Sequence, residues 1–268
     1  MVSRQSIQDE IRGFVSRYRS EHGTETGWRP PLVGFATVKD PLFAALKRVV
    51  SPSHALPDDL LPGARTVIAY FVPFENAVGE SNIDGQMASP QWVRAYMETN
   101  TLLEEVGACA KELIETAGES VVVPPPTHNF DSEKLISDWS HRHVAFIAGL
   151  GRFGLNNMLI TKSGCCGRVG SLVTTLDVPA DRRSEREACL NRHGVDCERC
   201  VYRCVGAALS KEMFDRHKCY AMCLRNAEKY RDQGLADVCG KCLVDVPCSS
   251  ADPVSALTQS DPQSEKDK

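Results

Sequence analysis

The sequence lacks any long apolar run. No stretch in its 268 residues approaches the roughly 20 consecutive apolar residues that a membrane-spanning helix needs. The first residues, MVSRQSIQDEIRGF, have neither the apolar core of a secretory signal peptide nor a twin-arginine pair. We therefore expect a cytoplasmic protein without a membrane partner, in a compartment that keeps thiols reduced.

The sequence also lacks an excess of basic residues. Its formal net charge is -4, which gives no general attraction for nucleic acid, because that affinity comes from neutralising phosphates. A local basic patch is still compatible with this charge. The 42% hydrophobic and 25% charged fractions are typical of a globular protein, and 268 residues suffice for one large domain or two smaller ones.

Cysteine, by contrast, is abundant, and nine of the 12 cysteines lie between Cys189 and Cys248. Thiolates at this density bind soft metals. The spacing Cys-x2-Cys-x3-Cys is the core of the bacterial ferredoxin motif, in which the cysteine after the x3 gap binds the other cluster. The full pattern is Cys189-x7-Cys197-x2-Cys200-x3-Cys204, then Cys219 and Cys223, then Cys239-x2-Cys242-x5-Cys248.

We interpret eight of these thiolates as ligands of two [4Fe–4S] clusters. The first cluster is assigned four cysteines from the two ends of the stretch: Cys189, Cys197, Cys200 and Cys248. The second is assigned four from its middle: Cys204, Cys219, Cys239 and Cys242. Cys223 follows Cys219 by about one helical turn and is an alternative ligand.

Two other interpretations of the cysteines compete with clusters. A disulfide framework is typical of short secreted chains, and paired Cys-x2-Cys units also make zinc sites. The additional upstream cysteine, Cys189, favours clusters over zinc. Outside the stretch, Cys109 falls on the apolar face of an expected helix, and the adjacent Cys165 and Cys166 in a tight turn are expected to be incidental thiols beside a site.

The chain before the cysteines predicts a mixture of helices and strands. Runs rich in β-branched and aromatic residues predict strands over Leu32–Val38, Arg65–Val72 and Arg168–Leu176. Apolar residues at helical spacing predict an opening helix around Ile7–Tyr18 and a long helix over Trp92–Ala117. The polar segment 73–90 is expected to be a surface loop, with a mobile loop over a site as the alternative. Residues 251–268 are expected to be a disordered tail.

A further helix is expected over about Glu133–Ala148, followed by the glycines of Gly149-Leu-Gly151-Arg-Phe-Gly154. These letters match G-x-G-x-x-G, but a dinucleotide fingerprint follows a strand and opens a helix, and here the order is reversed. The glycines are better explained by close passage of the backbone past a bulky group.

Four segments of the sequence resemble the epoxyqueuosine reductases and the catalytic core of the corrinoid reductive dehalogenases. They are PLVGFATV, LPGARTVIAYFVPF, HVAFIAGLGRFGLNNMLITKSG and GRVGSLVTTL, and the resemblance covers roughly residues 31–250. It implies an α/β fold, with a nitroreductase-like domain over 1–180 that binds cobalamin and a ferredoxin-like two-cluster module over 181–250. The clusters would pass electrons to cobalt, which would reduce a substrate while a nearby acid gives a proton.

The resemblance also implies site residues. Asp131, followed by Ser132, resembles the family's proton donor; Asp138 is an alternative, and a helix N-cap is the structural reading of Asp131. His143 is expected to be a core histidine, whereas His141 either contacts the corrinoid or is exposed to solvent. The remaining candidate cofactor contacts belong to the glycine element: Gly149, Gly151, Gly154 and Asn156.

Three departures from the family pattern bear on function. Gly194 stands where the first motif usually has its first cysteine, and the gap before Cys248 is five residues instead of three. We expect the protein to lack the helical-repeat domain that helps many epoxyqueuosine reductases hold tRNA, so the chain resembles a shorter paralogue and tRNA is a doubtful partner. We expect a small-molecule or nucleoside substrate and an electron donor of the ferredoxin or flavodoxin type. The alternatives are an electron carrier or reductive activator without corrinoid, and a structural zinc protein.

Overall fold

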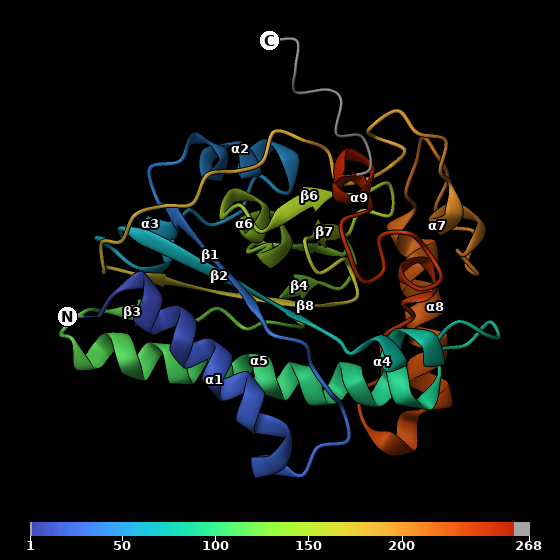
Figure 1. The fold of residues 1–268 in the computed structure, drawn as a ribbon, viewed down its shortest axis with the longest axis horizontal. Coiled ribbons are helices and arrows are strands. Elements are labelled where there is room, and N and C mark those ends of the chain that lie inside the picture. Colours follow the sequence, from blue (N-terminus) through green and yellow to red (C-terminus); the bar gives the residue numbers. More distant parts are fainter. Residues whose placement is uncertain (1, 260–268) are drawn as a thin grey trace.

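A four-stranded antiparallel sheet forms the centre of the computed structural model, which describes residues 2–259 (Figure 1). The strand order is β1-β2-β8-β3, and the sequence expectations for the three long strands are confirmed. All eight residues of β2 are buried, because helices cover both faces of the sheet. The strands are β1 (Leu32–Thr37), β2 (Thr66–Pro73), β3 (Val121–Val122) and β8 (Gly167–Thr174).

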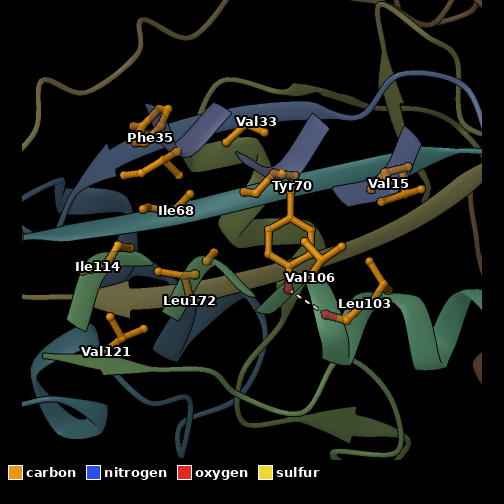
Figure 2. Packing of buried hydrophobic residues seen from close by; sticks show 14 of the residues in the cluster. Val15, Val33, Phe35, Ile68, Tyr70, Leu103, Val106, Ile114, Val121 and Leu172 are labelled. Carbon is orange, nitrogen blue, oxygen red and sulfur yellow. Dashed lines mark hydrogen bonds between the residues drawn. The ribbon is translucent and has the colours of Figure 1, made fainter. Parts of the chain in front are cut away.

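Helices α1 (Arg4–His22) and α5 (Pro90–Thr116) cover one face of the sheet (Figure 1). Ser3 begins α1 with a capping box that Ser6 completes, so the helix starts one turn earlier than the apolar pattern indicates. Figure 2 shows the shared core, where the buried Tyr70 of β2 donates its hydroxyl hydrogen bond to the carbonyl of Leu103 at 3.0 Å. This bond satisfies a phenol that would otherwise be costly to bury.

The other face is covered by α2 (Pro41–Val49), α6 (His141–Ile147) and a ribbon of β6 (Gly151–Phe153) and β7 (Leu159–Thr161). Alternate residues of each strand point to this second core, as the two-residue period of a strand requires. The short helix α3 (Pro57–Leu60) lies in the connection to β2.

The expected helix over 133–148 is wrong in its first half. A hairpin of β4 (Phe130–Asp131) and β5 (Ile136–Ser137) occupies that part, and α6 begins only at His141. The Asp131 carboxylate accepts backbone hydrogen bonds from Glu133 and Lys134, which stabilises a turn in place of a helix.

The cysteine region carries α7 (Arg199–Tyr202) and α8 (Arg216–Lys229), with short 3₁₀ turns η1 (Arg231–Gln233) and η2 (Lys241–Leu243). Residues 205–211 form no helix, and an isolated bridge joins Leu209 to Phe214. Asp215 caps α8 and fixes its start.

Segment 73–90 packs against the cysteine region and contains α4 (Asn76–Ser81). One hydrophobic cluster joins Val78 and Trp92 with Cys189, Tyr230 and Leu243, so the cysteine region shares its core with the sheet domain. Arg203 also donates to the carbonyl of Ile83. The segment is therefore a packed connection, not a free surface loop.

The expectation of a disordered tail is wrong for its first part. Helix α9 (Pro253–Gln259) follows the last cysteine, and Val254 is buried. The remainder of that tail, 260–268, lies outside the described residues. Within 2–259, none of the helices has the length and hydrophobicity required to cross a membrane.

Candidate iron–sulfur sites and the adjoining cavity

The cysteines of the first assigned set converge on one small cavity. This cavity of about 20 Å³ has walls that include Leu155, Ile160 and Val246. Burial, followed by the nearby Cys248, Cys189 and Cys197, raises the pKa of Cys200 to about 12. A buried thiol surrounded by three further cysteines is therefore a poor thiolate by itself, and a cationic centre among them would favour its charged form. The cysteines that line the cavity are Cys189, Cys197, Cys200 and Cys248.

The second assigned set lines a different cavity of about 360 Å³. Gly240 turns the chain between two of these cysteines with φ +71°, and a Cβ there would lie 2.2 Å from the ring of Trp92, so only glycine fits. The sulfur of Cys204 accepts a hydrogen bond from the backbone N–H of Ala208 at 3.2 Å. The cysteines that line this cavity are Cys204, Cys219, Cys223, Cys239 and Cys242.

Cys219 and Cys223 lie one turn apart on α8 and are hydrogen-bonded to each other. The bond from Cys223 lowers the pKa of Cys219 to about 7, and the same bond raises the pKa of Cys223. Cys219 is therefore the better thiolate of the pair, and Cys223 serves as its donor. Both thiols line the cavity, and the assignment of Cys219 as the ligand, with Cys223 as the alternative, stays a prediction from the sequence.

The structure thus brings together both sets that the spacing predicts, although the ligand roles themselves stay a prediction. Within residues 2–259, no group of three or more His, Cys, Asp or Glu side chains is arranged to hold a single metal ion. Cys165 and Cys166 are buried next to the first set, where the Cys165 thiol is hydrogen-bonded to Cys166 and Cys248. Cys109, which is distant in sequence from both sets, is half-buried, and its thiol donates to the carboxylate of Glu10 at 3.1 Å.

A larger cavity of about 770 Å³ adjoins the second cysteine set. Its walls include the rings of Trp139, Phe153 and Tyr220, and it shares Cys219 and Cys223 with the 360 Å³ cavity. The polar side chains on its wall are uncharged or basic. A large ligand in this space would therefore contact the second cysteine set directly.

His141 lines this cavity but is buried, so the expectation of solvent exposure is wrong. Its Nε2 donates to the carbonyl oxygen of Pro125 at 2.8 Å, because a carbonyl can only accept. Its Nδ1 therefore accepts from the hydroxyl of Ser171 at 2.8 Å, and Ser171 in turn accepts from the indole of Trp139. Burial lowers the pKa of His141 to about 4. Both ring nitrogens are engaged within the protein.

His143, expected as a core histidine, is half-buried against the ring of Phe153, with centroids 4.7 Å apart. Its Nδ1 lies 2.8 Å from the hydroxyl of Ser140, and burial lowers its pKa to about 4. Unlike His141, it has a ring nitrogen for which no protein partner was found in the described part of the chain, and it lines the large cavity.

The glycine element has a structural explanation. A Cβ on Gly151 would lie 2.2 Å from the carbonyl oxygen of Ile160, which belongs to the paired strand β7. A Cβ on Gly154 would lie 2.8 Å from the side chain of Ile160. Gly149 has φ +77° and ends α6 against Arg182. None of these glycines lines the large cavity, whereas Asn156 lies between the two cysteine sets and donates to the carbonyl of Cys242 at 3.4 Å.

Asp131 is exposed at the turn of the β4–β5 hairpin and does not line the cavity. Backbone hydrogen bonds from Lys134 and Glu133 hold its pKa below the usual range. Its neighbours Phe130, Leu135 and Ile136 do line the cavity, so the hairpin belongs to the cavity wall while this carboxylate faces away. Asp138, the alternative, accepts from Ser53 at 2.6 Å.

Sequence reasoning missed a polar network on the floor of the 360 Å³ cavity. The hydroxyl of Tyr96 donates to Asp237 at 2.7 Å, the same carboxylate lies 3.0 Å from Nε2 of His128, and Arg168 stacks over the Tyr96 ring at 4.5 Å. These residues come from α5, a loop, β8 and the cysteine region. No local motif could have signalled a network assembled from segments so far apart in sequence.

The sequence matches no protein-family model and no curated protein. Solved structures are nevertheless similar in fold. The chain superposes on an epoxyqueuosine reductase from Bacillus subtilis with a TM-score of 0.55, 16% identity, and coverage of 91% of this chain and 67% of that one. That structure is described as having its catalytic aspartate loop swung out of the active site.

Two further structures extend the comparison. An epoxyqueuosine reductase from Streptococcus thermophilus gives a TM-score of 0.51 at 16% identity, over 91% of this chain and 69% of that chain. A catabolic reductive dehalogenase gives 0.55 at 18% identity, over 85% of this chain and 31% of that chain. The chain spans 66% of one selenomethionine-labelled epoxyqueuosine reductase. The mixed α/β fold of these reductases is therefore shared, and this chain is shorter than they are.

Proposed function

We propose that the protein is an iron–sulfur reductase in which two [4Fe–4S] clusters deliver single electrons to a ligand bound in the large cavity. The observation that carries this proposal is the separation of the cysteines into two sets, of which the second opens onto that cavity. A cluster on Cys204, Cys219, Cys239 and Cys242 would be adjacent to the bound acceptor, and the first set would hold the outer cluster.

The indole of Trp92 supports occupation of the second site by a cluster. Its N–H is buried, lines the 360 Å³ cavity beside Gly240, and finds no hydrogen-bond acceptor in the part of the chain that the structure describes. A buried unpaired donor is costly, and hydrogen bonds to cluster sulfur are an ordinary feature of such sites. A cluster sulfur is the acceptor that this position lacks.

The cavity suits a corrinoid as the acceptor. A corrinoid is a wide apolar ring whose rim carries amide groups, and it supplies low-potential cobalt chemistry when bound. Trp139, Phe153 and Tyr220 offer apolar surface for the ring, and Asn157 offers hydrogen bonds for its rim. His141 is less suited to contact it than the sequence indicates, because both of its ring nitrogens are already bonded.

The proposal is tested by metal analysis of anaerobically purified protein, followed by reconstitution with iron, sulfide and cobalamin. About eight iron and eight sulfide per chain, for two [4Fe–4S] clusters, together with bound cobalt, are expected. Zinc without acid-labile sulfide would refute the redox function. The tRNA of the epoxyqueuosine reductases is not carried over, and the substrate is proposed to be a small molecule or nucleoside.

A second function is favoured if the same iron content occurs without cobalt. The protein would then be an electron carrier or a reductive activator of a partner protein. The side chain of Tyr202, two residues before Cys204 in the chain and 80% exposed, offers an apolar surface for such a partner. Reversible low-potential redox without corrinoid uptake would select this function.

A further inference from the structure

The wall of the large cavity carries charge of one sign. Its charge comes from three arginines, and no aspartate or glutamate is among the described residues that line the 770 Å³ cavity. Three histidines also line it, but His141 and His143 are neutral near pH 7 because burial lowers the pKa of each to about 4. In the adjoining 360 Å³ cavity the lone carboxylate is that of Asp237, which is already bonded to Tyr96 and His128. The basic residues are Arg142, Arg168, Arg216, His128, His141 and His143.

In the described part of the chain, none of the three arginines has a carboxylate oxygen within 4.0 Å of its guanidinium nitrogens. Arg142 donates to the carbonyl of Asn157 at 3.0 Å and to the sulfur of Met158 at 3.1 Å, and among the described residues it meets no carboxylate within 4.0 Å. The guanidinium of Arg168 stacks over Tyr96. Arg168 is also hydrogen-bonded to Tyr96 and lies near the carboxylate of Asp237, which offsets part of its charge. Guanidinium groups present forked N–H donors that match carboxylate and phosphate oxygens, and Arg142 retains donors for which no acceptor is found in the described chain.

We propose that this cavity binds an oxyanion, a carboxylate or phosphate group, held by Arg142 and Arg168 with Arg216 at the rim. The inference rests on the proposed function in taking this cavity as the place where the corrinoid and the substrate meet, and it narrows the substrate to an organic anion. Aromatic walls from Trp139 and Tyr220 complete a site for an anion attached to a flat apolar body.

Two sources of negative charge compete for these arginines. The thiolates of Cys219 and Cys242 lie close enough to Arg142 to act on it electrostatically, so a cluster there offsets part of its charge. A corrinoid with a nucleotide loop also brings its own phosphodiester. The test must therefore separate a substrate anion from a cofactor phosphate. It must also separate both of these from arginines that only neutralise the negative charge of the cluster.

The test measures binding to the reconstituted holoprotein by isothermal titration. Benzoate and phenyl phosphate are the anionic probes, and benzamide is the neutral probe of matched shape. We expect either anion to bind at least tenfold more tightly than benzamide, and Arg142→Gln, Arg168→Gln and Arg216→Gln each to weaken the anion severalfold or more. Arg225→Gln, an exposed cation on α8 outside the cavity wall, is the control and is expected to change nothing.

Corrinoid binding to the same variants identifies the source of the anion. Weaker uptake of cobalamin with unchanged uptake of cobinamide, which lacks the phosphodiester, assigns the arginines to a cofactor phosphate; this supports the oxyanion site and overturns the anionic substrate. Weaker benzoate binding with both corrinoids unchanged assigns them to the substrate. Equal affinity for benzoate and benzamide overturns the inference, as do variants that shift only the cluster potential. Iron, sulfide and cobalt contents test the proposed function separately from these affinities.

Discussion

The buried amine of Lys241 donates to the carbonyl oxygens of Asn82 and Asp84, at 2.8 and 2.6 Å. Lys241 lies between Cys239 and Cys242 and is 1% exposed, so a lysine inside the cysteine region anchors segment 73–90. Lys241→Met keeps the length of the side chain but leaves two carbonyls without their donor. We expect a loss of about 1–3 kcal/mol in the free energy of unfolding.

The measurement is the thermal midpoint of the holoprotein, together with limited proteolysis within 73–90. Lys218→Met, at an exposed position on α8, is the matched control and is expected to leave both unchanged. Equal effects of the two substitutions would show that the anchoring bonds of Lys241 do not stabilise the docked segment.

The two cysteine sets predict that the clusters can be removed separately. Cys200→Ala removes a member of the first set and Cys242→Ala a member of the second, so each is expected to lower the iron content from about eight to about four per chain. Cys109→Ala is the control, because that thiol binds Glu10 on α1 instead. Loss of all iron in either variant would contradict independent sites.

The choice between Cys219 and Cys223 follows from the same experiment. Cys219→Ala is expected to lose the second cluster, whereas Cys223→Ala removes only a hydrogen-bond donor and is expected to keep it. Iron retention in Cys219→Ala with loss in Cys223→Ala would reverse the assignment.

The unpaired indole N–H of Trp92 leads to a prediction about the reduction potential of the neighbouring cluster. If its indole N–H donates to cluster sulfur, Trp92→Phe removes a bond that favours the more negative reduced state. A neutral hydrogen bond of about 1 kcal/mol corresponds to roughly 40 mV for a one-electron couple. We expect the midpoint potential of one cluster to fall by that order in a titration monitored by electron paramagnetic resonance. Trp28→Phe, whose indole already donates to Thr99, is the control.

The sequence was informative where a pattern is local. The β-branched runs predict β1, β2 and β8, and the cysteines assigned to two sets from their spacing line two separate cavities, the second together with Cys223. It was misleading at Asp131, where a side chain that caps a turn resembles one that begins a helix. It was silent on the network of Tyr96 and Asp237, because their contact depends on how α5 meets the cysteine region.

Asp131 remains a predicted proton donor that the described conformation places outside the cavity wall. Asp131→Asn preserves an oxygen for the two backbone hydrogen bonds of the turn but cannot give a proton. If the hairpin moves to bring this side chain inward, turnover is expected to fall about 100-fold or more, the usual scale of acid catalysis. Asp58→Asn, exposed on α3, is the control. Unchanged turnover, with clusters intact, would leave Asp131 only its structural role.

His141 makes the stability of the fold depend on pH. Burial lowers its pKa to about 4 from 6.5, so between these values the unfolded chain binds a proton that the folded chain excludes. Stability is therefore full above pH 6.5 and falls as the pH drops toward 4, by about 3 kcal/mol for this side chain. His143 and His54, whose pKa values burial also lowers, act in the same direction.

A variant isolates the contribution of His141. His141→Gln keeps one donor for the carbonyl of Pro125 and one acceptor for the hydroxyl of Ser171, but it cannot take up a proton in this range. The thermal midpoint of the variant is expected to fall less than that of the parent between pH 6.5 and 4, by about 2–4 °C for each kcal/mol. His217→Gln, exposed on α8, should reproduce the parent curve. Parallel curves for parent and His141→Gln would mean that His141 is protonated in the folded protein, and the hydrogen-bonded chain from Trp139 through Ser171 would then have to open.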